Sequence, residues 1–169
     1  MDWIGFMYWF IKFYLSPMIA NASPVLVRGN KRIDSGKVFI DGKPLFGPNK
    51  TWEGFLLGFY LGSLTSLLVA LLYRDELLIL IGSGASLSAL LGDLTGSFIK
   101  RRLGIKSGDP LPLLDQLDFA VFASLYYTLL DLREFYKPLY VLVSLVIITV
   151  LHILTNRVAY LLGVKDKKW

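Results

Sequence analysis

The sequence contains no cysteine and only one histidine, His152, in 169 residues. The absence of cysteine excludes disulfide bonds, cysteine-ligated zinc and thiol nucleophiles. His152 lies inside an apolar run, where it lacks a partner for a catalytic dyad, so we interpret it as a satisfied interior residue. Any chemistry must therefore rest on carboxylates, lysine, arginine and bound metal ions.

Charged residues are also scarce, at 18% of the chain, whereas 54% of the residues are hydrophobic and the mean hydropathy is +0.55. Several apolar runs reach the roughly 18 to 20 residues that cross a bilayer as a helix. The sequence thus predicts an all-α integral membrane protein that forms a single transmembrane domain over residues 1–169. Five transmembrane helices are expected, at about residues 3–27, 52–73, 77–99, 117–132 and 139–162.

Two polar loops, 28–51 and 100–116, separate these helices on one side of the membrane. Asp41-Gly42 lies between two short apolar runs, which predicts a small hairpin in the first loop. The first apolar run is too long and too aromatic for a cleaved signal peptide. Lys12 within that run either snorkels to an interface or faces a polar interior.

Lysine and arginine gather in three segments: six between Arg28 and Lys50, four between Lys100 and Lys106, and three after Gly163. Cytoplasmic loops carry an excess of such residues, so we expect the N-terminus outside and the C-terminus and both polar loops in the cytoplasm. The cations lie between apolar segments rather than on one soluble face. The net charge of +5 therefore favours the membrane surface and nucleotides as partners, and not nucleic acid.

Small residues recur at four-residue spacing along the second expected helix. Such a stripe allows another helix to approach closely inside the bilayer. The partner helix can belong to the same chain or to a second one, which leaves a homodimer open. The stripe consists of Gly54, Gly58, Gly62 and Ser66.

The third expected helix carries Asp93 on a face of small residues that recur every three or four positions. An ionisable side chain on the packed face of a membrane helix is costly, so a functional role is its first interpretation. Lys100 and Arg101 follow seven and eight residues later, on the same side. The face contains Gly82, Ser86, Ala89, Asp93, Gly96 and Lys100.

Asp115 and Asp118 lie three residues apart at the start of the fourth expected helix, so both point from one face. Together with Asp93 they offer three carboxylates, which suit Mg²⁺ as a hard cation. Each alone is also compatible with an ordinary charge near a helix N-terminus. The three acids with cations between them form the candidate site.

Lys50 precedes the second expected helix. Thr51 or Asn49 is placed to cap the N-terminus of that helix. The exposed N–H groups of a helix N-terminus favour an anion, which makes Lys50 a candidate phosphate ligand. A capping segment with a snorkelling lysine is the equal alternative.

These motifs resemble the signature of the CTP-dependent phosphatidate cytidylyltransferases, the CDP-diacylglycerol synthase family. The short length and three further segments resemble its archaeal branch, the CDP-archaeol synthases. The motifs of the whole family are Gly92-Asp93-x-x-x-Ser97-x-x-Lys100-Arg101, Gly104-Ile105-Lys106 and Asp115-x-x-Asp118. The three archaeal segments are Asn21-Ala22-Ser23-Pro24, Asp41-Gly42-Lys43 and Lys50-Thr51-Trp52-x-Gly54.

The resemblance implies a Mg²⁺-dependent enzyme that joins CTP to an archaeal lipid phosphate, 2,3-di-O-geranylgeranylglyceryl phosphate. The products would be the CDP-lipid and pyrophosphate. Asp93, Asp115 and Asp118 would hold the metal and, with Lys100, form the catalytic set. The substrate-binding set would be Lys50, Thr51, Ser97, Lys100, Arg101 and Lys106.

The sequence departs from the bacterial and eukaryotic members where they carry a His-Gly-Gly segment and an arginine, because Leu113, Leu114 and Gln116 stand there. This difference bears on the lipid rather than on the chemistry. Two other functions stay open: a CTP-dependent polyprenol kinase, and a small membrane transporter whose Asp93 binds a cation.

Overall fold

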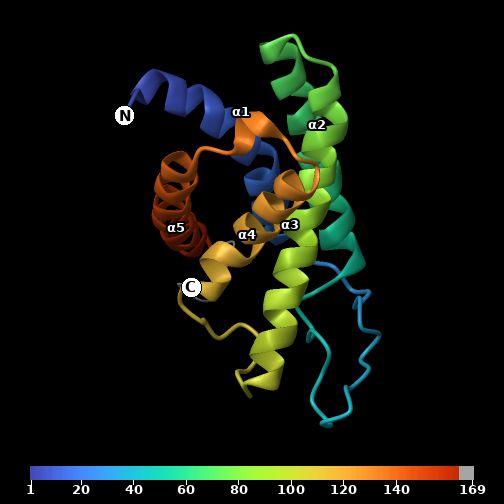
Figure 1. Cartoon of the computed structure of the whole chain (residues 1–169). Helices are drawn as coiled ribbons and strands as arrows, with labels where there is room; N and C mark the ends of the chain where they lie inside the picture. The colour runs from blue at the N-terminus through green and yellow to red at the C-terminus, as the bar shows by residue number, and fades with distance from the viewer. Residues whose placement is uncertain (164–169) are drawn as a thin grey trace.

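The computed structural model describes residues 1–163, and in that part of the chain all regular structure is helical. This confirms the all-α prediction (Figure 1). The C-terminal cations Lys165, Lys167 and Lys168 lie outside the described residues. The elements are α1 (Trp3–Ala22), η1 (Ser23–Leu26), α2 (Trp52–Tyr73), α3 (Leu77–Arg102), α4 (Leu114–Leu129), η2 (Arg133–Phe135) and α5 (Pro138–Leu161).

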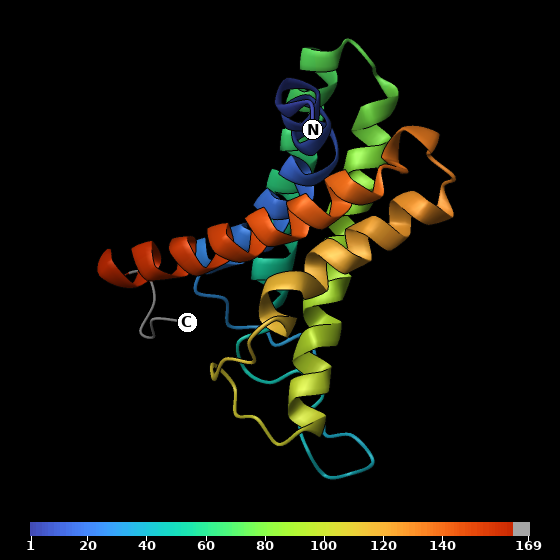
Figure 2. The same cartoon turned by 60° about the vertical axis from the view of Figure 1, so that its left-hand side comes forward.

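Three helices, α2, α3 and α5, are long and apolar enough to cross a membrane among the described residues. The fourth helix has 16 residues, which gives about 24 Å at 1.5 Å per residue and is shorter than the hydrocarbon core. In addition, α5 runs at a steep angle to α2 and α3 rather than alongside them (Figure 2). Five membrane crossings therefore stay a prediction.

Four helix ends differ by at least three residues from the expected positions. The first helix ends at Ala22 instead of residue 27 and continues as a short 3-10 turn. The third helix extends to Arg102 instead of residue 99, because cations in a last turn interact favourably with the helix dipole. The fourth helix begins at Leu114 instead of residue 117 and ends at Leu129 instead of residue 132. As a result, the cations Lys100 to Arg102 and the acid Asp115 lie on helices rather than in the loop.

The stripe of small residues on α2 packs against α1 and α3 of the same chain. A Cβ atom on Gly58 would lie 2.6 Å from the carbonyl oxygen of Ala20, and one on Gly62 would lie 2.6 Å from Oγ of Ser86. Ser66 Oγ donates a hydrogen bond of 2.7 Å to the carbonyl of Leu78. Glycine at these positions thus brings three helix backbones together.

An aromatic core fills the end of the molecule at which α1 begins. Trp9 stacks on Phe135 with ring centroids 5.5 Å apart, and its indole N–H donates to the carbonyl of Glu134. Lys12 pairs with the carboxylate of Glu134 and lies over the ring of Tyr73. Lys12 is therefore held by a specific ion pair at that end of the molecule.

The loop 28–51 contains two isolated antiparallel bridges and no strand among its described residues. One bridge, Val38 to Pro44, flanks a turn in which Gly42 has φ +73°, a conformation that favours glycine. Asp34, only 5% exposed, accepts hydrogen bonds from the backbone N–H groups of Gly36, Phe46 and Gly47. This carboxylate is the centre around which the loop folds.

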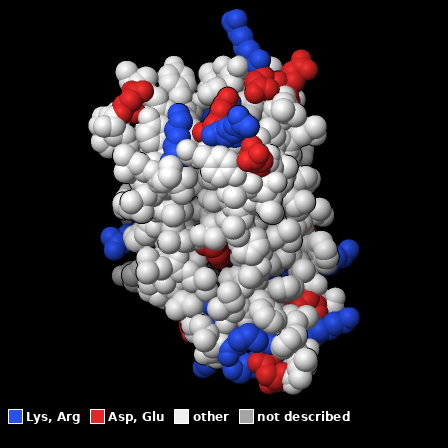
Figure 3. Space-filling model, viewed as in Figure 1, with Lys and Arg blue, Asp and Glu red and all other residues white. Residues whose placement is uncertain are grey.

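The tip of the same loop is fastened to the last turn of α3. Arg102 forms an ion pair of 2.8 Å with Asp41, and its guanidinium packs against the rings of both Phe39 and Phe98. Lys43 Nζ donates to the carbonyl of Arg102 at 2.7 Å. In the view of Figure 3, charged side chains gather mainly at the two ends of the molecule. The surface between the ends is largely uncharged, apart from a recessed acidic side chain near its centre and basic side chains at its two margins.

Candidate active site

A cavity of about 590 Å³ lies where the C-terminal half of α3 meets the start of α4 and the loop 28–51. The end of α1 and the C-terminal half of α5 complete its walls. A cavity of this size accommodates a ligand as large as a nucleotide. Seven of the predicted site residues line it: Lys50, Asp93, Ser97, Lys100, Arg101, Asp115 and Asp118.

The depth of the cavity follows from the position of Asp93 along α3. Asp93 lies 16 residues after Leu77, about 24 Å along the helix at 1.5 Å per residue. The hydrocarbon core of a bilayer is about 30 Å thick. Asp93 thus lies within the long apolar helix α3, about two turns before Lys100.

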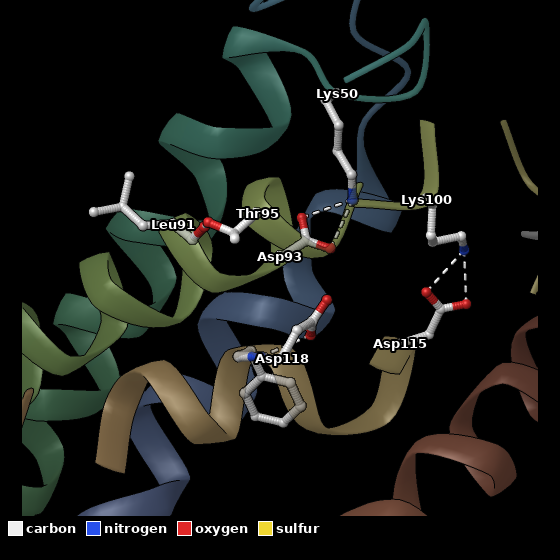
Figure 4. A network of polar contacts seen from close by, with 8 residues as sticks. Lys50, Leu91, Asp93, Thr95, Lys100, Asp115 and Asp118 are labelled. Atoms are coloured by element: carbon white, nitrogen blue, oxygen red, sulfur yellow. Dashed lines mark hydrogen bonds and ion pairs between the residues drawn. The ribbon is translucent and has the colours of Figure 1, made fainter. Parts of the chain in front are cut away.

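Asp93 is held by Lys50, which reaches it from the end of the loop. The Nζ atom of Lys50 lies 2.7 Å from Oδ1 and 2.6 Å from Oδ2 of Asp93 (Figure 4). The two side chains are 25% and 28% exposed. The backbone positions Lys50, because its carbonyl accepts from the N–H of Ile33 and the next residue, Thr51, caps α2 by accepting from the N–H of Gly54.

A second ion pair of the same geometry joins α3 to α4. Nζ of Lys100 lies 2.8 Å from each carboxylate oxygen of Asp115. Asp115 also accepts a hydrogen bond of 2.8 Å from the backbone N–H of Leu111. Because Lys100 is in the last turn of α3 and Asp115 in the first turn of α4, this pair fixes the two helix ends that form the mouth of the cavity.

Asp118 forms no ion pair among the described residues. Its Oδ1 accepts from the backbone N–H of Phe119 at 2.6 Å, and the negative charges of Asp93 and Asp115 act on it. Figure 4 shows its carboxylate pointing from α4 toward Asp93. Asp118 is therefore the carboxylate of the cavity that is most open to a cation.

Two glycines of α3 make this position of Asp118 available. A Cβ atom on Gly96 would collide with Oδ2 of Asp118, and one on Gly92 would lie 2.6 Å from its carbonyl oxygen. Gly92 and Gly96 lie four residues apart, and Asp93 lies between them in the sequence. All three belong to the side of α3 that α4 covers. The small residues of this helix face predict close helix packing, but they do not by themselves predict that an acid occupies the space beside them.

Arg101 supplies a cation that no carboxylate pairs with among the described residues. Its side chain is 6% exposed, Nη2 donates to the carbonyl of Lys106 at 3.2 Å, and Nε has no hydrogen-bond partner. Gly47, at φ +100°, lies against the guanidinium and leaves room for it. A fixed guanidinium with an unused N–H is suited to bind a phosphate oxygen.

Two predicted substrate ligands do not line the cavity. Thr51 caps α2, and Lys106 has an exposed side chain and contributes its carbonyl to Arg101. Ser97 does line it. Contacts of Thr51 and Lys106 with substrate stay predictions.

The three carboxylates are the type of ligand that a hard divalent cation prefers, but they are not arranged around a single metal position. Asp93, Asp115 and Asp118 line one cavity, yet residues 1–163 contain no group of three acids or histidines close enough to enclose a metal. Two of the three acids are held by lysines. Mg²⁺ favours one or two carboxylates completed by water and phosphate oxygens, which this arrangement can supply. Metal binding stays a prediction.

Other polar residues of the cavity were not predicted as site residues. His152, expected to be a satisfied interior residue, lines the cavity from α5 together with Asn156 one turn later. Their spacing of four residues on a predominantly apolar helix was the available signal. The remaining polar residues of this group are Asn21, Arg28, Asn49, Ser107, Asp109, Thr155 and Gln116.

Comparisons with known proteins agree over nearly the whole chain. Residues 3–169 match the family model described as CarS-like, CDP-archaeol synthase. The CDP-archaeol synthase of Staphylothermus marinus is 63% identical over 165 residues, which cover 97% of this chain and 94% of the relative. The CDP-archaeol synthase of Aeropyrum pernix is 44% identical over 160 residues, covering 92% and 88%.

A solved structure is also similar. It is described as "Structural insight into an intramembrane enzyme for archaeal membrane lipids biosynthesis". The TM-score is 0.80 at 42% identity, and the match covers 86% of this chain and 91% of the other.

Proposed function

This chain belongs to the CDP-archaeol synthase family, and on that basis we propose that it transfers the CMP moiety of CTP to 2,3-di-O-geranylgeranylglyceryl phosphate. It is a CTP-dependent transferase of lipid biosynthesis. The observation that carries the proposal is the cavity, whose lining includes three carboxylates, two lysines and Arg101 beside the long apolar helix α3. Such a site can hold a polyphosphate beside a lipid headgroup.

The proposed reaction needs no nucleophilic side chain. An oxygen of the lipid phosphate forms a bond to the α-phosphorus of CTP, and the bond from that phosphorus to the α,β-bridging oxygen breaks. The bridging oxygen leaves with pyrophosphate. Because the nucleophile is already an anion, catalysis requires alignment of two phosphates and neutralisation of their charge.

The residues of the cavity divide between these two tasks. Lys50, Lys100 and Arg101 bind and orient phosphate oxygens by charge-assisted hydrogen bonds. Asp93, Asp115 and Asp118 would hold Mg²⁺, which when bound neutralises the charge that develops on the phosphates.

The lipid and its orientation are part of the proposal. The lipid phosphate would reach the cavity from the bilayer, and the cationic loops 28–51 and 100–116 would face the cytoplasm, where CTP is available. The branched geranylgeranyl tails differ in shape from straight acyl chains along their whole length. The protein should therefore prefer the ether lipid phosphate to a diacyl phosphatidate, although each methylene contributes only about 1 kcal/mol.

This proposal is tested with purified protein in detergent, Mg²⁺ and either lipid. Pyrophosphate release is expected with CTP and the geranylgeranyl lipid phosphate, and much less with ATP. Equal turnover of both lipids would refute the lipid preference and leave the transfer chemistry standing. Release of CDP in place of pyrophosphate would instead identify a lipid kinase.

A further inference from the structure

The ion pairs of the cavity indicate how metal and nucleotide binding are coupled, and this inference rests on the proposed function. We propose that Lys50 and Lys100 occupy the positions beside Asp93 and Asp115 that a metal ion would take, until metal and CTP bind together. Each lysine then changes partner, from a carboxylate to a phosphate. Divalent cation and CTP consequently bind with positive cooperativity.

The geometry of both pairs supports this exchange. In each pair one ammonium lies within 2.6 to 2.8 Å of both oxygens of one carboxylate. A divalent cation held by both oxygens of that carboxylate would need the same position. A metal held by both oxygens of Asp93 or of Asp115 therefore requires Lys50 or Lys100 to move away.

The lysines need a new anionic partner in order to move. They are 25% and 11% exposed, so a released ammonium would remain partly buried beside the incoming cation, at a high electrostatic cost. The phosphates of CTP provide the required negative charge. Metal binding thus favours nucleotide binding, and the reverse must hold to the same degree.

The net charge of the cavity leads to the same conclusion. Among the described residues its lining carries four carboxylates and four lysine or arginine side chains, which cancel. A neutral cavity attracts neither a lone polyphosphate nor a lone cation strongly. A nucleotide that arrives with a divalent cation brings both kinds of partner at once.

Asp118 and Arg101 would start the exchange, because the described residues offer them no ion pair. Asp118 can meet the cation and Arg101 a phosphate before any existing pair opens. The other two acids and the two lysines would then exchange partners.

The test uses the full-length protein in detergent without lipid, so that no turnover occurs. Mn²⁺ binding is measured by electron paramagnetic resonance and CTP binding by equilibrium dialysis, each alone and in the presence of the other. We expect each dissociation constant to fall by at least about 10-fold when the other ligand is present. Equal affinities with and without the second ligand would overturn the inference.

Removal of an ammonium separates this account from general charge effects. Lys50→Met should bind Mn²⁺ alone at least about 5-fold more tightly than the wild-type protein, bind CTP more weakly and show less coupling. Lys100→Met should do the same through Asp115, which covers the case that one variant fails to fold. Lys12→Met is the matched control, since it removes a lysine ion pair at the opposite end and should leave both constants unchanged.

The outcomes also separate this inference from the proposed function. Failure of CTP to bind even with Mn²⁺, or equal binding of ATP, would count against cytidylyl transfer itself. Tight binding of CTP without any coupling would refute only the exchange of partners. Unchanged or weaker Mn²⁺ binding in both lysine variants would likewise refute only the exchange of partners.

Discussion

At the scale of single residues, the three acids of the cavity differ in their partners. Asp93 and Asp115 are each held by a lysine, whereas Asp118 has no such partner among the described residues. The sequence predicted the three acids from their spacing and from the cost of Asp93 in a membrane helix. It could not predict the two lysine pairs, because they depend on how the loop, α3 and α4 are placed relative to one another.

The first prediction concerns the metal-binding role of these acids. Asp93→Asn and Asp118→Asn should each lower kcat/KM by about 100-fold or more, since loss of one hard oxygen ligand removes several kcal/mol of charge stabilisation. Pyrophosphate release by detergent-purified protein measures the effect. Asp75→Asn, in the turn between α2 and α3, is the control and should stay active. Near-normal turnover in either variant would remove that acid from the metal site.

A second prediction concerns the space that Gly96 leaves for the carboxylate of Asp118. Gly96→Ala places a methyl group where Oδ2 of Asp118 lies, so the carboxylate or the whole of α4 must shift. Misplacement by about 1 Å can lower catalysis by about 100-fold, and we expect a loss of that order in kcat. Thr95→Ala is the matched control, because the Thr95 hydroxyl donates to the carbonyl of Leu91 one turn earlier in the same helix. Wild-type activity of Gly96→Ala would contradict the close approach of α4 to α3.

At the scale of elements, the apolar runs predicted which helices form, and the small-residue stripe predicted that another helix packs closely on α2. That the stripe meets α1 and α3 of the same chain was left open by the sequence. The ends of α3 and α4 were wrong by three residues, because Lys100 to Arg102 and Asp115 were assigned to a polar loop. These charges suit helix ends, cations at a C-terminus and an acid at an N-terminus. The role of α5 as a wall of the cavity was missed, since it depends on the steep angle that only the structure shows.

A third prediction belongs to the loop 28–51, which carries Lys50. Burial would raise the pKa of Asp34, but hydrogen bonds from the N–H groups of Gly47, Gly36 and Phe46 outweigh it and lower the pKa. The lowered pKa means that the charged form stabilises the folded loop. This stabilisation is present above the ordinary aspartate pKa of about 3.9 and is lost as the pH falls through the lower folded pKa.

Asp34→Ala should remove that support at neutral pH. We expect faster trypsin cleavage within the loop and a larger effect on the KM for CTP than on kcat, because Lys50 loses its fixed position. Asp2→Ala, at the other end of the molecule, is the control. Unchanged proteolysis in Asp34→Ala would show that the loop does not depend on this carboxylate.

At the scale of the whole molecule, the sequence predicted a membrane protein with five helices, and the number of crossings is open to a direct test. Lys106 and Arg133 flank α4 and are both exposed. Because the chain lacks cysteine, single cysteines at these positions can be labelled selectively. If α4 crosses the membrane, Lys106→Cys should be labelled only from the cytoplasmic side and Arg133→Cys only from outside. Labelling of both from one side would show that α4 does not cross.

The central claim is transfer of the CMP moiety to a lipid phosphate at this cavity. The most direct measurement compares CTP labelled with ³²P at the α-phosphate with CTP labelled at the γ-phosphate, each incubated with Mg²⁺ and geranylgeranyl lipid phosphate. The account predicts that the α label enters the lipid and the γ label leaves as pyrophosphate. Appearance of the γ label in the lipid, with the α label remaining in CDP, would contradict it.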